Sequence, residues 1–117
     1  MPRFLAIYVG TATARAKAAW DEQSPEMLLQ QQEDGMRAWG EWVARNQAAI
    51  VDMGTPLGKT KRVSREGVAD MTNTSVAYVI VEAATHDKAA RLFENHPHFS
   101  VFAGDSVEVM ECLSLPA

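Results

Sequence analysis

The residues best suited to chemistry lie near the C-terminal end, where the sequence NHPHFS places His96 and His98 on either side of Pro97. An imidazole can act as a general acid or base near neutral pH, and several together can bind a metal ion. Zinc needs three or four ligands, and the third histidine, His86, comes at the start of the preceding predicted helix. We therefore expect no metal and no other cofactor at this pair.

His96 is the stronger functional candidate, because it directly follows a predicted helix and would lie near the edge of a sheet. There its ring could reach Tyr8, Tyr78 or Glu82 and exchange a proton with a bound molecule. The alternative is that His96 only caps the helix and packs against the sheet. For His98 the end of a helix is explanation enough, because a histidine there complements the helix dipole and meets free carbonyl groups.

Two carboxylates, Glu82 and Glu108, occupy predicted strands whose other residues are mostly apolar. A buried carboxylate must be paired, hydrogen-bonded or protonated, so each needs a partner. Glu82, or Asp52 in its place, could work with His96 in proton transfer, and Glu108 could line a ligand pocket. The alternative for both is an ion pair with a nearby arginine.

Aromatic residues could form the walls of such a pocket. Tyr8 and Tyr78 lie in predicted strands, and Trp39 lies in the long predicted helix. Trp39 belongs to the apolar stripe of that helix, whereas Trp42 would face a partner or the rim of the pocket. The alternative is packing alone, because aromatic residues at helical spacing more often belong to the core.

Composition narrows the class of protein. The chain has 117 residues, 47% of them hydrophobic, a net charge of -4 and one cysteine, Cys112. These values favour a single globular domain over residues 1–117. The acidic balance argues against a nucleic-acid partner, since surfaces that bind phosphates are normally basic. One unpaired cysteine and a first apolar run, MPRFLAIYVG, that is too short to be a signal peptide or to span a membrane make a cytoplasmic location the expectation.

Hydrophobic periodicity and end signals predict six elements in the order β, α, β, β, α, β. This order is typical of a ferredoxin-like α+β fold, in which two helices cover one face of a four-stranded antiparallel sheet. Residues 11–20 are expected to form a helical turn or an ordered loop, with Trp20 packed against the body. The predicted strands cover residues 3–9, 61–65, 75–84 and 105–113, and the predicted helices cover residues 25–53, after an N-cap at Ser24, and 86–96.

Alternation along the strands predicts two sheet faces of different character. The face expected under the helices is aliphatic and carries Leu5, Ile7, Val9, Ala77, Val79, Val81, Val107 and Val109. The opposite face is mixed and carries Phe4, Ala6, Tyr8, Val76, Tyr78, Ile80, Glu82, Glu108, Met110 and Cys112. A face this apolar needs a cover, and a second copy of the chain would close the two sheets into a barrel with space for a small ligand.

Three stretches of the sequence resemble the YCII-related family of small bacterial proteins. They are GTPLG followed by KRVSREGVAD, then YVIVEAATHDKAARLFENHPH, and the terminal GDSVEVMECL. The resemblance implies a ferredoxin-like fold that dimerises into an α+β barrel, with a pocket between sheet and helices. It also implies, for some members, a catalytic histidine paired with an aspartate.

The sequence departs from that family pattern in two places. The first predicted strand and its continuation, RFLAIYVGTATA, contain no histidine, and GTPLGKTK stands where one branch of the family has DGPF. A binding or accessory role, as a homodimer with a pocket for a small organic ligand, is therefore our first expectation. The alternative is a small-molecule enzyme that uses His96 with a carboxylate for general acid and base catalysis.

Overall fold

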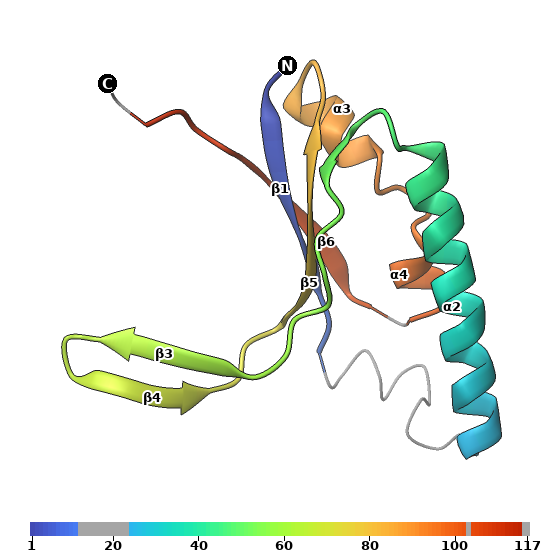
Figure 1. The fold of residues 1–117 in the computed structure, drawn as a ribbon, viewed down its shortest axis with the longest axis horizontal. Coiled ribbons are helices and arrows are strands. Elements are labelled where there is room, and N and C mark those ends of the chain that lie inside the picture. Colours follow the sequence, from blue (N-terminus) through green and yellow to red (C-terminus); the bar gives the residue numbers. More distant parts are fainter. Residues whose placement is uncertain (12–23, 103, 116–117) are drawn as a thin grey trace.

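The computed structural model describes residues 1–11, 24–102 and 104–115. The prediction of a helical turn or ordered loop with Trp20 against the body lies mostly on residues outside these ranges. The described strands are β1 (Arg3–Val9), β2 (Ile50–Asp52), β3 (Thr60–Ser64), β4 (Gly67–Met71), β5 (Ser75–Glu82) and β6 (Ser106–Glu111), and the described helices are α2 (Pro25–Arg45), α3 (His86–Arg91) and α4 (Pro97–Ser100) (Figure 1).

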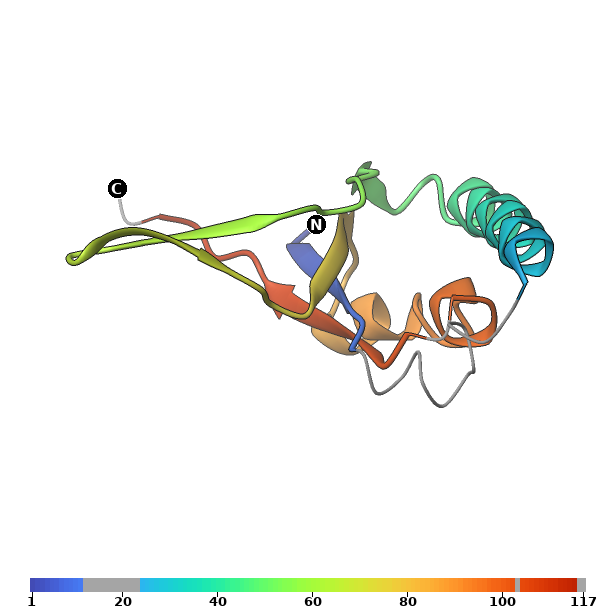
Figure 2. The same cartoon turned by 90° about the horizontal axis from the view of Figure 1, so that it is seen from below.

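The main sheet is antiparallel and has the strand order β2-β5-β1-β6. Strand β1 is central, because it pairs with β5 on one side and with β6 on the other. The described helices α2, α3 and α4 lie on one face of this sheet (Figures 1 and 2). This confirms the predicted α+β, ferredoxin-like fold with a four-stranded antiparallel sheet.

Helix α2 begins where the sequence predicts. The Ser24 side chain accepts a hydrogen bond from the backbone N–H of Met27, and Pro25 occupies the first turn. The prediction that this helix continues to residue 53 was wrong, because it ends at Arg45. Asn46 caps it: its backbone N–H donates to the carbonyls of Trp42 and Val43, and its Nδ2 donates to the carbonyl of Trp42 at 2.9 Å, so the polar groups of the last turn are satisfied without a further turn.

The second strand of the main sheet was also assigned to the wrong residues. The edge strand is β2, in which the β-branched Ile50 lies opposite Val81 of β5. Residues 61–65, predicted for this place, fall in β3 and its turn, and β3 pairs with β4 in a separate two-stranded sheet. The physical reason is that β2 brings an apolar side chain to the sheet, whereas every residue of 61–70 is exposed.

The residues of β1 that face the helices were predicted wrongly, whereas those of β5 and β6 were predicted correctly. The buried residues of the helix-covered face are Phe4, Ala6, Tyr8, Ala77, Val79 and Val81, with Val107 and Val109 packed against them. Phe4 lies opposite Val81 and Tyr8 lies opposite Ala77, and residues directly opposite in an antiparallel pair share a face. Both phases of β1 are apolar, so alternation within that strand could not show which one faces the helices.

The other face of the sheet is open in the single chain. Rows across it read Tyr78, Ile7, Glu108 and then Ile80, Leu5, Met110. The hairpin β3–β4 projects away from the body on this open side, and so does the chain after β6 (Figure 2). No helix in the described ranges is both long and apolar enough to cross a membrane.

Candidate functional site

The segment NHPHFS contains the N-cap and all residues of the short helix α4, which follows α3 after a turn. Helix α3 starts at the predicted N-cap, Thr85, whose side chain accepts from the backbone N–H of Lys88. Asn95 then takes a left-handed backbone conformation with φ of 58°, which asparagine tolerates better than most residues. Pro97 does not only end a helix: it stands in the first turn of the short helix α4, for which His96 is the N-cap.

His96 is completely buried, and both of its ring nitrogens have partners. Nδ1 accepts a hydrogen bond from the backbone N–H of His98 at 3.0 Å, so Nδ1 is unprotonated. The neutral ring then carries its proton on Nε2, which lies 3.1 Å from the hydroxyl oxygen of Tyr8. His96 therefore donates to Tyr8, and the cap fixes the tautomer.

Burial keeps both members of this pair neutral. Burial lowers the pKa of His96 to about 3, and the nearby His98 ring adds to the decrease. Burial also raises the pKa of Tyr8 well above its usual range. The pair is thus an uncharged hydrogen bond over a wide range of pH.

Aromatic rings enclose His96. Its ring centroid lies 4.5 Å from that of Trp39 and 4.6 Å from that of Trp42. The Tyr8 ring contacts both Trp39, at 4.6 Å, and Phe93, at 5.9 Å. A bound molecule can meet His96 only after one of these rings moves.

A hollow of about 590 Å³ lies beside this cluster, between α2, the segment 53–56 that follows the edge strand β2, and the start of β5. Such a volume is typical of pockets that bind small molecules. Trp39 connects the two features, because it lines the hollow and packs on His96. The His98 ring also lines the hollow. The rest of the lining is mainly apolar and includes Met36, Val43, Met53 and Phe102, and Tyr78 borders the hollow although it lies in the open-face row of Ile7.

His98 is almost fully buried and ties the ends of two strands together. Its Nε2 lies 2.9 Å from the carbonyl oxygen of Val9 and 3.1 Å from that of Ser106. Burial lowers the pKa of His98, against the opposing effect of these carbonyls and of Asp105. Gly104 is pressed against the ring, because a Cβ there would lie 2.0 Å from Nε2.

Only part of the predicted site is assembled in one chain. Tyr8, Trp39 and His96 are in contact. Glu82 and Glu108 lie on the open face of the sheet instead, and the partners of His96 are Tyr8 and a backbone amide rather than a carboxylate. In the described part of the chain, no three histidine, cysteine, aspartate or glutamate side chains gather where they could hold a metal ion.

A solved structure shares this fold. It is 5-chloro-2-hydroxyhydroquinone dehydrochlorinase (TftG) from Burkholderia phenoliruptrix AC1100, in complex with 2,5-dihydroxybenzoquinone. The TM-score is 0.53 at 18% sequence identity, over 92% of this chain and 89% of that one. No protein-family model matches the sequence, and no curated protein matches it significantly. The likeness to the dehydrochlorinase establishes a common fold.

Trp42, expected at a partner or at the rim of the pocket, is buried instead, and its indole N–H donates to the carbonyl of Leu92 at 2.9 Å. Trp39 is half-buried and lines the hollow. Sequence reasoning also missed Phe102, whose ring lies against Gly35 of α2. The available signal was Gly35 itself, a glycine that lowers helix stability and is explained by such a close approach.

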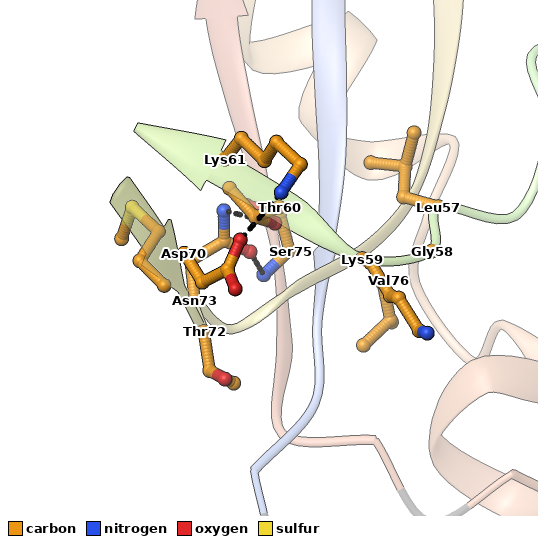
Figure 3. Close-up of a pocket in the computed structure, with 11 residues that line it drawn as sticks. Leu57, Gly58, Lys59, Thr60, Lys61, Asp70, Thr72, Asn73, Ser75 and Val76 are labelled. Carbon is orange, nitrogen blue, oxygen red and sulfur yellow. Dashed lines mark hydrogen bonds and ion pairs between the residues drawn. The ribbon is translucent and has the colours of Figure 1, made fainter. Parts of the chain in front are cut away.

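A second hollow, of about 530 Å³, lies at the root of the hairpin (Figure 3). Lys61 and Asp70 form an ion pair across it at 2.6 Å, and Asn73 donates to the Thr60 hydroxyl at 3.3 Å. None of the residues that line it is buried. Polar groups this exposed are hydrated and do not make a preformed site, so the apolar hollow is the better candidate.

Proposed function

We propose that residues 1–117 form one domain of a YCII-related homodimer, which binds a small and largely apolar organic molecule in the hollow between α2 and β5. The observation that carries this proposal is the hollow itself, with its aromatic and aliphatic lining next to two buried histidines. The dehydrochlorinase of similar fold is described in complex with a small ring compound, which supports a small-molecule role. The one cysteine, Cys112, is exposed and unpaired, in keeping with a reducing compartment such as the cytoplasm.

Gly40 offers a direct test of the hollow as a binding site. It lines the hollow, and a Cβ at this position would meet no atom within 4 Å. The substitution Gly40→Leu therefore adds a bulky side chain at the wall of the hollow without a clash at Cβ. We expect it to weaken the binding of a naphthalene-sized probe at least about ten-fold in titration calorimetry, since the added side chain takes the place of the ligand.

The matched control is Ala44→Leu, one turn further along α2 at an exposed position away from the hollow. It adds a comparable apolar side chain to the same helix and should leave the affinity unchanged. Equal affinities in all three proteins would place the ligand elsewhere and refute the proposal.

The partner that covers the open face is, in this proposal, a second copy of the chain. That face carries an apolar centre of Leu5, Ile7, Ile80 and Met110. A hairpin alone is marginally stable in water, and β3–β4 projects beyond this face without a cover of its own (Figure 2). The net charges have opposite signs, because the hairpin and its root carry Lys59, Lys61, Arg62 and Arg65 against Glu66 and Asp70, whereas the open face carries Glu82 and Glu108 against Arg3.

The dimer is tested by Ile7→Glu, which puts a carboxylate beside Glu108 at the centre of the open face. We expect a dimer for the parent protein in light scattering at micromolar concentration and a folded monomer for the variant. Leu29→Glu, at an exposed position of α2, makes the same type of change on the helix side and should leave the dimer intact. A parent protein that is monomeric would rule out the barrel.

The alternative function is catalysis, with His96 as a general acid or base and Glu82 or Asp52 as its carboxylate. The observation behind this alternative is the buried contact between Tyr8 and His96. Binding is preferred, because the pKa of His96 is lowered to about 3 and its ring has no open side in this conformation. A reaction that is lost in His96→Asn and kept in Glu82→Gln and Asp52→Asn would support a role for His96 without those carboxylates.

A further inference from the structure

The tautomer of His98 follows from its two backbone contacts. Both atoms near Nε2, the carbonyl oxygens of Val9 and Ser106, can only accept hydrogen bonds. Nε2 must therefore carry a proton, shared between the two carbonyls. Because burial also lowers the pKa of His98, the ring is neutral near pH 7 and Nδ1 holds a free lone pair.

That Nδ1 atom has no hydrogen-bond partner among the described residues. It is also not sealed inside the protein, because Oε1 of Gln31 is the only fully buried side-chain nitrogen or oxygen in the described part that lacks a partner. The ring is otherwise enclosed, with 3% of its surface exposed, and it lines the apolar hollow. Nδ1 is thus an unpaired acceptor that is not fully buried, on a ring that lines the hollow.

The rest of the lining indicates which class of ligand would fit the hollow. Trp39 and Phe102 form aromatic walls, and Met36 and Met53 are exposed and adaptable apolar groups at the opening. A charged ligand would lose its hydration here without a charged partner in return. A ligand that carries a hydrogen-bond donor would meet an unpaired acceptor in Nδ1 of His98, in a lining whose other side-chain hydroxyls belong to Thr55 and Tyr78.

We propose that the site selects a flat, uncharged aromatic molecule with a hydrogen-bond donor, of the phenol or indole type, and that His98 Nδ1 accepts from this donor. The proposal rests on the proposed function, because it assigns ligand class and orientation within the same hollow. The Gly104 backbone holds the His98 ring in place, so the acceptor is positioned before the ligand arrives.

The test compares two probes that differ in the donor alone, 2-naphthol and 2-methoxynaphthalene. We expect the parent protein to bind 2-naphthol about 3- to 10-fold more tightly, as measured by titration calorimetry, because one neutral hydrogen bond is gained. In His98→Phe the ratio of the two affinities should fall to about one. Equal affinities in the parent protein, or an unchanged ratio in the variant, would overturn the assignment.

A second measurement covers the case in which His98→Phe fails to fold after its Nε2 donor is lost. In the ¹⁵N-histidine-labelled parent protein, Nε2 of His98 should give a protonated signal and Nδ1 an unprotonated one. The Nδ1 signal should shift on addition of 2-naphthol and stay in place with the methyl ether. A shift of equal size with both probes contradicts the hydrogen bond.

The outcomes separate the two proposals. If both probes bind equally and Gly40→Leu blocks both, the hollow is a binding site and only the role of His98 is refuted. If neither probe binds, or Gly40→Leu has no effect on either, the proposed function itself is refuted.

Discussion

The hydroxyl oxygen of Tyr8 and Nε2 of His96 lie 3.1 Å apart, and neither side chain has any exposed surface. The two residues are 88 positions apart in the sequence, so this contact joins the central strand β1 to the turn before α4. Its direction is fixed from the other side of the ring, because the backbone N–H of His98 occupies Nδ1. The contact is therefore a structural bond that also sets the position of Trp39 beside the hollow.

Removing the Tyr8 hydroxyl should destabilise the protein. Tyr8→Phe keeps the ring but leaves the Nε2–H of His96 buried without an acceptor, which typically costs about 1–3 kcal/mol. We expect the free energy of unfolding to fall by that amount in urea titrations at a fixed protein concentration, since association would otherwise contribute.

Tyr78→Phe is the matched control for this change. Tyr78 is half-buried on the open face of the sheet, and its hydroxyl has no hydrogen bond to the described residues. The loss of this hydroxyl should change the stability by less than about 0.5 kcal/mol. Equal losses in the two variants would mean that the bond between Tyr8 and His96 contributes nothing specific.

The protein should lose stability as the pH falls below neutrality. Unfolded His96 takes up a proton near pH 6.5, whereas the folded residue does so only near a pKa of about 3. Between these values the unfolded state binds more protons, so the free energy of unfolding decreases as the pH is lowered, by up to about 1.4 kcal/mol per pH unit for one proton. His98 contributes in the same direction, because its pKa is also lowered.

His96→Asn isolates the contribution of this residue. Asparagine is a good N-cap and can accept from the backbone N–H of His98, so α4 keeps its start while the titrating ring is lost. Denaturant midpoints measured from pH 4 to pH 7 should then show a slope that is shallower by about one proton. A parent-like slope in His96→Asn would contradict the assignment.

The elements with strong local signals were predictable from the sequence. Residues 75–82 are a run of β-branched and apolar residues, and Ser24 and Pro25 mark a helix start by their own hydrogen-bonding properties. The end of α2 was not predictable in this way. Asn46 can cap a helix with its side chain, but the apolar residues at 50–53 continue the helical pattern beyond it. Only the structure shows that Ile50 pairs with Val81 of β5 instead.

The candidate site was less predictable, because it depends on relations between strands. The phase of β1 is decided by its pairing with β5, and this pairing moves Tyr8 from the open face to the side of His96. His98 looked like an ordinary residue at a helix end, yet its ring lies under the junction of β1 and β6. Neither the pairing of β1 with β5 nor the contacts of His98 can be recognised from the neighbouring residues in the sequence.

The two glycines inside α2 should respond oppositely to alanine. Both gain helix propensity, worth up to about 1 kcal/mol, when glycine is replaced. A Cβ at Gly40 meets nothing within 4 Å, so Gly40→Ala should raise the free energy of unfolding by about 0.5–1 kcal/mol.

A Cβ at Gly35 would lie 2.2 Å from Cζ of Phe102, so the ring must leave its place. Overpacking of this kind costs about 1–3 kcal/mol, and Gly35→Ala should be less stable than Gly40→Ala by that margin in the same urea titrations. Because Phe102 lines the hollow, Gly35→Ala should also weaken ligand binding. Equal stability of the two variants would show that the Phe102 ring does not rest on α2.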